Sequence, residues 1–459
     1  MGCQPVPGGF LSRASNGRAV AALCAALLIR AVPPLAALAW TGGGRAFHAP
    51  DTASYLACAE SLARGDGFAA GGEPEIYRTP GFPLLLVPGV LAGRPAAVTI
   101  PLQVALGSLT AWLVYRLAGL LSSSRRAALA AMMLFAVEPL SVLYCGILLS
   151  ETLFAAALTL AALLLARRAS GGGRGSLVGA ALALSASAYV RPVSYWLPPP
   201  AAAYLLWAGR RRGARRAALG AGAFLAICAA LTGAWRVRNR VETGYGGFSA
   251  VSDDALYYYH GAAVEAASSG ESYYDVRRRM CSGEDPRRPA IDPGPARPAP
   301  PQRYAGMAAE GLAIIRAHPM AFAAIYAKGL ARTLLDPGAA DWLKYLGFYR
   351  EGGGLLGETV DRGLARTVLS LPRRHPGVFW TGLGLGLLLL AYLVAAAAGL
   401  LSRPGPGAGA PALALAYILL LSGGPNALAR FRHPAMPLLC VFAGIGLEAA
   451  ARGRRGAER

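Results

Sequence analysis

The sequence contains little charge and almost no lysine. Only 15% of its 459 residues are charged, Lys328 and Lys344 are its only lysines, and 55% are apolar, with a mean hydropathy of +0.42. Soluble proteins carry about 25% charged residues, so a single soluble domain is excluded, and the apolar content excludes a disordered chain. The net charge of +21 comes from arginines in short clusters between apolar runs, so we expect no nucleic-acid partner. The composition predicts an integral membrane protein.

Several motifs that carry chemistry are also missing. The seven cysteines form no CxxC pair, and there is no HExxH motif, so we expect neither a metal site nor a cofactor. The absence of GxxxxGK[ST], and of GxGxxG between a strand and a helix, argues against a nucleotide-sugar enzyme or an ATP-driven pump. A disulfide that joins Cys281 to Cys58 or Cys145 stays open.

Ten apolar runs predict membrane-spanning helices, because a span needs about 20 mostly apolar residues. The short connections between alternate runs are basic, which places them in the cytoplasm. We read the first run as an uncleaved signal anchor, so that both termini lie inside. The predicted spans are Ala19–Trp40, Pro95–Leu121, Ala127–Cys145, Leu149–Ala166, Gly175–Val190, Tyr195–Gly209, Ala217–Trp235, Pro376–Leu401, Pro411–Gly424 and Pro434–Ala450.

These runs predict an all-α polytopic membrane protein whose long external loops carry juxtamembrane helices. Residues 1–240 are expected to form a seven-span N-terminal module with its first external loop at 41–94. Residues 241–375 form an external segment, and residues 376–459 a three-span module with a basic cytoplasmic tail. Ala317–Leu335 is nearly apolar enough for an eleventh span, but that would put the tail outside, so we expect a helix lying in the membrane interface.

Carboxylates and arginines gather at the predicted outer ends of the spans. Asp51 follows the first span, where it is either a helix N-cap or a catalytic carboxylate. Glu138 and Glu151 lie at the mouth of an external hairpin, where ionisable groups are costly and suggest function. Ser150 and Thr152 beside Glu151 are equally typical of helix capping. Arginines beside carboxylates suit a phosphate-bearing substrate at the outer leaflet, although each alone is typical of a headgroup anchor. These arginines are Arg78, Arg191, Arg236, Arg238, Arg430 and Arg432.

Several motifs follow one another along the chain. The first external loop carries Asp51…Tyr55…Gly65-Asp-Gly67-Phe68 and then Arg78-Thr-Pro80-Gly81-Phe82-Pro83. The later motifs are Leu149-Ser150-Glu151-Thr152, Arg191-Pro192, Trp235-Arg236-Val-Arg238-Asn239, His318-Pro319 and Arg430-Phe431-Arg432-His433-Pro434. Together and in this order, these motifs resemble those of the GT-C membrane glycosyltransferases. They are similar to glycosyltransferase family 39, which includes protein mannosyltransferases and lipid A aminoarabinose transferases.

The resemblance implies a GT-C-type bundle that takes a hexosyl or pentosyl group from a polyprenyl-phosphate donor at the external face of the bacterial inner membrane. The sugar passes with inversion to a hydroxyl of a lipid, glycan or protein acceptor. Asp51 and Glu151 would be catalytic, with Asp51 as general base, and the six arginines would bind the donor phosphate. No second acid follows Asp51, which argues against a protein acceptor. The expected substrate-positioning residues are Tyr55, Glu138, Asn239 and His433.

Two other functions fit the same residues. A lipid or small-molecule transporter or flippase would use the arginines as headgroup sites, and discontinuous helices with a midplane ionisable residue would favour it. A non-catalytic scaffold for envelope assembly would tolerate the loss of Asp51. Because the ionisable residues gather at one face, we expect the enzyme.

Overall fold

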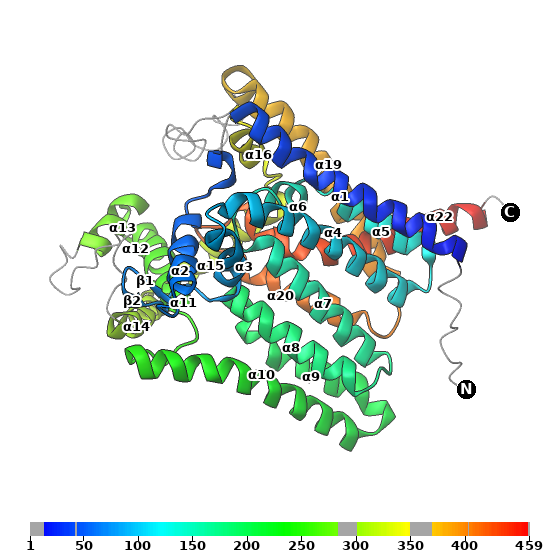
Figure 1. Cartoon of the computed structure of the whole chain (residues 1–459), viewed down its shortest axis with the longest axis horizontal. Coiled ribbons are helices and arrows are strands. Elements are labelled where there is room, and N and C mark those ends of the chain that lie inside the picture. The colour runs from blue at the N-terminus through cyan, green and yellow to red at the C-terminus, as the bar shows by residue number, and fades with distance from the viewer. Residues whose placement is uncertain (1–12, 42–43, 283–300, 349–369, 403, 458–459) are drawn as a thin grey trace.

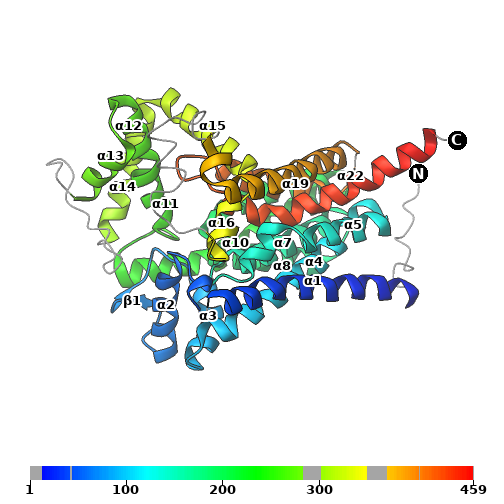
Figure 2. The ribbon, with the colours of Figure 1, turned by 90° about the horizontal axis from the view of Figure 1, so that it is seen from above.

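The protein is a bundle of long helices that carries a group of shorter helices at one end. The structure, a computed structural model, describes residues 13–41, 44–282, 301–348, 370–402 and 404–457. Figure 1 shows the long helices running side by side, with α11 to α14 beyond one end of them. In Figure 2 the first turns of α1 and the last turns of α22 lie at the opposite end. Nearly all regular structure in the described residues is helical, so the predicted all-α polytopic architecture is confirmed.

All ten predicted spans fall on helices, but the helices differ in length. Six of the described helices are long and apolar enough to cross a membrane by length and composition. The other predicted spans form shorter helices, and α3 adds an apolar helix of 11 residues. The six long helices are α1 (Arg13–Thr41), α4 (Pro95–Ser122), α7 (Glu151–Ala169), α10 (Ala214–Thr243), α19 (Pro376–Leu401) and α22 (Met436–Ala457), with the α22 span counted from Ala429. The shorter helices that correspond to predicted spans are α8 (Arg174–Val190), α9 (Pro198–Gly209) and α20 (Gly409–Leu421), and the additional helix α3 is Gly81–Leu91. The remaining predicted span, the third, falls on two helices.

The third predicted span is wrong in its continuity. The chain breaks between α5 (Arg125–Ala136) and α6 (Pro139–Tyr144), because Pro139 has no N–H to continue a helix. Glu138 begins the new helix: its carboxylate accepts hydrogen bonds from the backbone N–H of Leu140 at 3.3 Å and of Ser141 at 2.7 Å, and from the Ser141 hydroxyl at 2.6 Å. The break leaves the last carbonyls of α5 without helical partners.

A buried arginine of α1 satisfies those carbonyls. Arg30 is fully buried, and its guanidinium donates to the carbonyl oxygens of Phe135 at 2.7 Å and Ala136 at 3.0 Å, and lies over the Phe135 ring. A charge at this depth is costly unless it is hydrogen-bonded. Arg30 therefore ties α1 to the end of α5.

The segment after α10 is also helical. Figure 2 shows α11 to α15 grouped beside the end of the bundle that also carries α2. The helix expected at Ala317–Leu335 is present as α15, and its place in the membrane interface stays a prediction. The helices of this end are α2 (Thr52–Arg64), α11 (Val251–Asp254), a π-helical turn (Ala255–Gly261), α12 (Ala262–Ser269), α13 (Tyr273–Ser282), α14 (Pro301–Ala317), α15 (Pro319–Leu335) and α16 (Ala339–Tyr345).

The remaining regular elements are short. Strands β1 (Ala69–Ala70) and β2 (Glu73–Pro74) pair antiparallel in the first external loop. A four-residue helix, α21 (Ala429–Arg432), precedes α22. Short 3-10 turns cover Gly44–Phe47, Pro192–Trp196, Arg210–Arg212 and His433–Ala435.

The main core joins both ends of the sequence. Phe442 of α22 lies fully buried in one apolar cluster with Met132 and Phe135 of α5. The division into N-terminal and C-terminal modules stays a prediction, since these parts share a core. Cys58 and Cys145 are free and buried, and the side chain of Cys281 lies outside the described residues.

Candidate active site

Two carboxylates and three arginines form one chain of ion pairs, which we call the outer cluster. Asp51 Oδ1 lies 2.8 Å from Arg78 Nη2, and Asp51 Oδ2 lies 2.8 Å from Arg430 Nη1. Arg430 Nε in turn contacts Glu151 Oε1, which also lies 2.5 Å from Arg191 Nη1. Residues from four distant parts of the sequence thus meet at the end of the bundle predicted to be external.

The outer cluster is largely shielded from solvent and carries a surplus positive charge. The Glu151 side chain is fully buried, and those of the three arginines are 17–19% exposed. Asp51 is the most accessible member, at 31%. Because three guanidinium groups face two carboxylates, the cluster retains one net positive charge. An anion near Asp51 would therefore find hydrogen-bond donors already oriented.

Hydrogen bonds to backbone carbonyls fix the loop that carries Asp51. Thr52, the first residue of α2, donates from its hydroxyl to the Leu148 carbonyl at 2.9 Å, and the Leu148 N–H donates to the Phe47 carbonyl at 2.8 Å. The Asp51 side chain caps no helix N–H, although it lies at the N-cap position of α2. The helix-cap interpretation of Asp51 is therefore wrong, because both of its oxygens are engaged by guanidinium groups.

A buried glutamine holds the turn that leads to Glu151. Gln103 of α4 donates from Nε2 to the carbonyl oxygens of Tyr144, Cys145 and Ile147, at 3.3, 3.1 and 2.7 Å. This turn follows α6 and ends where Glu151 begins α7. One side chain of a long helix thus positions the backbone from which Glu151 projects.

Arg78 is held by its own turn and by an aromatic ring. The Glu75 carboxylate accepts the backbone N–H of Tyr77 at 2.5 Å and of Arg78 at 3.1 Å. The Arg78 guanidinium lies 4.7 Å from the centre of the Tyr55 ring, and its Nε donates to the Ser54 hydroxyl at 3.0 Å. Tyr55, predicted to position substrate, therefore lies directly beside the outer cluster.

Burial and charge act in opposite directions on Asp51. Burial works to raise the pKa of the Asp51 carboxyl, but the Arg430 and Arg78 guanidinium groups outweigh burial and lower that pKa to about 2. Electrostatic interactions with Tyr55 and then with Asp51 raise the pKa of Arg78, against the effect of burial. Asp51 is thus a fixed anion in this arrangement, and a weak proton acceptor.

Three of the predicted phosphate-binding arginines do not join the outer cluster. Arg236 donates to the Gly246 carbonyl at 2.8 Å, and Arg238 to the carbonyls of Glu75 and Phe68, both at 2.7 Å. Arg432 is buried and donates to carbonyls at the end of α15, including that of Asp336 at 2.9 Å. These three arginines lie outside the outer cluster and donate to backbone carbonyls, and their role in binding the donor phosphate stays a prediction.

Three predicted positioning residues also make structural contacts. Asn239 donates to the carbonyls of Gly247 and Phe248, at 3.0 and 3.2 Å. His433 is buried, with its ring 5.1 Å from that of Tyr144 and edge-on to it. Glu138 caps α6, as described above. Asn239 and Glu138 thus support loops around the outer cluster, whereas Nδ1 of the buried His433 has no hydrogen-bond partner among the described residues.

An apolar groove lies beside the loop that carries Asp51. It has a volume of about 760 Å³ and runs between α1 and α4. Leu35, Leu38 and Val104 line it, together with His48 and Arg94, which lie next to the first external loop and at the start of α4. An apolar channel with a cation at its outer end is suited to a lipid whose headgroup is anionic.

Some supporting residues were missed from the sequence. Arg30 is an ionisable residue inside an apolar run, a signal that the sequence displayed. Gln103 and Glu75 carry no such signal, because their importance lies in the carbonyls and N–H groups that they meet. Among the described residues, no group of three or more His, Cys, Asp or Glu could hold a metal ion.

Comparison with known proteins assigns a family resemblance to part of the chain. Residues 89–235 match the sequence model of the dolichyl-phosphate-mannose-protein mannosyltransferases. This segment includes Glu151 and Arg191, whereas Asp51, Arg78 and Arg430 lie outside it. None of the curated proteins matches the chain.

Two crystal structures of ArnT from Cupriavidus metallidurans are similar to the chain. The one bound to undecaprenyl phosphate has 15% sequence identity and a TM-score of 0.41, and the match covers 96% of this chain and 79% of that one. The apo structure has 16% identity and a TM-score of 0.39, with 97% and 79% covered. The family match over residues 89–235 confirms that this multi-pass membrane protein resembles the GT-C membrane glycosyltransferases, in the manner of glycosyltransferase family 39.

Proposed function

We propose that the protein is an inverting membrane glycosyltransferase that uses a polyprenyl-phosphate sugar donor and an acceptor hydroxyl. The reaction takes place at the external face of the bacterial inner membrane. The observation that carries the proposal is the outer cluster, in which Asp51 lies between Arg78 and Arg430 with one positive charge in surplus. The family match over residues 89–235 supports the same reaction class, since its members are named for a dolichyl-phosphate-mannose donor.

Donor binding converts Asp51 from a fixed anion into a base. Arg78 and Arg430 each contact one oxygen of the Asp51 carboxylate. The donor phosphate replaces that carboxylate as the partner of both arginines. Once those guanidinium groups serve the phosphate, the interactions that lower the pKa of Asp51 to about 2 are lost, and burial raises that pKa. The carboxylate becomes a stronger proton acceptor only when the donor is present.

The transfer step then needs one base and one anion site. Asp51 takes the proton of the acceptor hydroxyl while the hydroxyl oxygen bonds to the anomeric carbon of the donor sugar. The bond from that carbon to the phosphate oxygen breaks, and its electron pair leaves with the polyprenyl phosphate. The arginines stabilise the charge that grows on the departing phosphate, and they need no reorganisation because they are already held. Attack opposite the leaving group gives inversion.

Glu151 acts on this step through Arg430. Its buried Oε1 accepts from Arg430 and Arg191, and Oε2 has no hydrogen-bond partner among the described residues. Glu151 therefore keeps Arg430 in place after Asp51 releases it. We assign it a positioning role.

The test is a transfer assay on purified protein in vesicles, with labelled polyprenyl-phosphate hexoses and pentoses and with lipid, glycan and peptide acceptors. We expect transfer from one of these donors, and only a matching acceptor to be labelled. Movement of the intact donor across the bilayer without transfer would contradict the enzyme and support a flippase. Full transfer activity in every Asp51 variant would assign the base to another residue, and neither transfer nor movement of any donor would support a scaffold.

The groove between α1 and α4 offers a separate test of the lipid carrier. Val104→Trp fills the groove from α4, so we expect a several-fold higher KM for a long-chain donor and little change for a short-chain one. Leu109→Trp is the matched control, because Leu109 lies on the same helix and is 47% exposed. Equal effects of both variants on both donors would exclude the groove as the chain site.

A further inference from the structure

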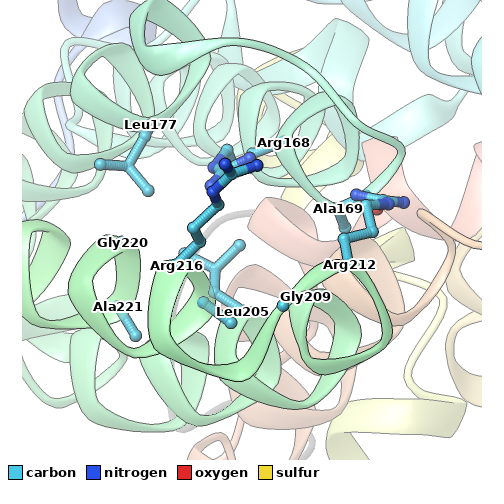
Figure 3. Close-up of a pocket in the computed structure, with 11 residues that line it drawn as sticks. Arg168, Ala169, Leu177, Leu205, Gly209, Arg212, Arg216, Gly220 and Ala221 are labelled. Carbon is cyan, nitrogen blue, oxygen red and sulfur yellow. The ribbon is translucent and has the colours of Figure 1, made fainter.

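A second group of arginines lines a pocket at the other end of α7, which we call the inner pocket. Its volume is about 200 Å³, and it lies where α7, α8, α9 and α10 come together. Figure 3 shows Arg168 and Arg216 extending into the same space, with Arg212 at the rim beside Ala169. Glu151 begins α7 and Arg168 lies in its last turn, so about 26 Å of helix separates the inner pocket from the outer cluster.

The arginines of the inner pocket have no carboxylate partner among the described residues. Arg168 donates to the Gly172 carbonyl at 3.1 Å and Arg212 to the Ala169 carbonyl at 2.6 Å, and no ion pair involves either of them or Arg216. These carbonyl contacts use one N–H each and leave most guanidinium donors available. Three like charges around one cavity repel each other, so an anion that enters it is stabilised by all three.

The walls of the inner pocket are apolar. Leu177 of α8, Leu205 of α9 and Ala221 of α10 face the same space as the arginines. Both basic connections, Arg167–Arg174 and Arg210–Arg216, are predicted to be cytoplasmic. A cationic rim above an apolar wall at the end of membrane helices matches an anionic lipid, with its phosphate at the rim and its chain along the wall.

We propose that the inner pocket binds an anionic phospholipid of the cytoplasmic leaflet. The arginines hold the headgroup phosphate, and Leu177 and Leu205 contact the start of an acyl chain. This site is independent of the proposed glycosyl transfer, because none of its residues belongs to the outer cluster. Gly220 leaves room for the phosphate, since a Cβ there would lie 3.3 Å from Arg168 Nη2.

The test measures lipid retention by native mass spectrometry on the purified full chain, with phosphatidylglycerol as probe and phosphatidylcholine as reference. Replacing the three arginines by glutamine should weaken phosphatidylglycerol binding on the order of 100-fold. The control replaces three exposed arginines of the predicted cytoplasmic connections that do not line the pocket, and should change binding no more than about threefold. Equal weakening in both variants would overturn the site in favour of general charge attraction. The control residues are Arg126, Arg174 and Arg211.

A second pair of variants keeps the charge unchanged. Gly220→Leu places bulk against Arg168 and Leu177, and we expect about tenfold weaker binding of phosphatidylglycerol. Gly222→Leu is the control, because a Cβ at Gly222 meets nothing within 4 Å. Unchanged binding in Gly220→Leu would overturn the proposal. Displacement of the lipid by millimolar inorganic phosphate would also overturn it, by assigning the pocket to a soluble anion.

Discussion

The outer cluster and the inner pocket are both built from arginines and lie at opposite ends of α7. They differ in the groups that balance the positive charge of those arginines. In the outer cluster every arginine contacts a carboxylate, and Glu151 is fully buried between two of them. In the inner pocket Arg168 and Arg212 donate to backbone carbonyls, and no ion pair among the described residues involves them or Arg216. A paired guanidinium is already held in place, and its anion can be exchanged for another. An unpaired one attracts an anion from outside.

The largest effect expected is on Asp51. Asp51→Asn keeps the shape of the side chain but removes the proton acceptor, so we expect sugar transfer to fall by about 10²–10⁴ with normal membrane insertion. The matched control is Asp66→Asn, an exposed carboxylate of the same loop that pairs with Arg64. Transfer rates of purified variants provide the measurement. If Asp51→Asn stays active while Glu151→Gln is inactive, Glu151 is the base.

The next effect is on stability and sharpens the contrast between paired and unpaired arginines. Arg430→Ala leaves the buried Glu151 with one partner and Asp51 with one, and we expect about 3–5 kcal/mol lower unfolding free energy. Adding Glu151→Gln removes the buried charge and should restore part of the loss. Unfolding in mixed micelles measures both, with Arg64→Ala of an exposed pair as the control, where under about 1 kcal/mol is expected. A double variant less stable than the single one would contradict the pairing.

A smaller effect follows from the pKa of Asp51. Its pKa is lowered from 3.8 to about 2 in the folded chain, so its ion pairs stabilise the fold above about pH 4. This contribution, about 2 kcal/mol, is lost as the pH falls through the folded pKa. We expect the stability difference between the wild type and Asp51→Asn to shrink toward zero between pH 4 and pH 2. A difference that is constant over this range would show that Asp51 is not held as an anion.

The smallest effect is expected for Arg212→Lys in the inner pocket, and Arg430→Lys in the outer cluster is its comparison. Arg430 bridges two carboxylates through separate nitrogens, which a single ammonium group cannot reproduce. Arg212→Lys should lower phosphatidylglycerol retention by no more than about threefold, because a lysine still supplies a point charge to a phosphate. Arg430→Lys should lose most transfer activity in the same preparation. Equal tolerance at both positions would remove the distinction between them.

Much of the helical framework could be predicted, because run length and loop charge are local properties. All ten apolar runs lie on helices, and Pro376–Leu401 has the predicted bounds. Pro139 also indicates the break in the third run. It was overlooked because the residues on both sides are apolar and together are long enough for one span. Arg30 was overlooked for the same reason.

The arrangement of the site could be predicted only in part. Asp51, Arg78, Glu151, Arg191 and Arg430 were singled out by residue type and by their place at predicted outer ends. Their partners could not be assigned, since Arg430 meets Glu151 from 279 positions away. In sequence, Arg238 and Arg432 resemble the arginines of the outer cluster. The structure distinguishes them by their contacts, since both donate to backbone carbonyls and Arg238 also pairs with Glu242.

The contact of Arg30 with the end of α5 has a consequence for biogenesis. The carbonyls that it binds belong to residues made 105 and 106 positions later. At a synthesis rate of about 5–20 residues per second, that separation corresponds to roughly 5–20 s. During this interval α1 carries a charge in its apolar run without the acceptors it has in the finished bundle. Arg30 of α1 thus lacks these acceptors until the third apolar run arrives beside it.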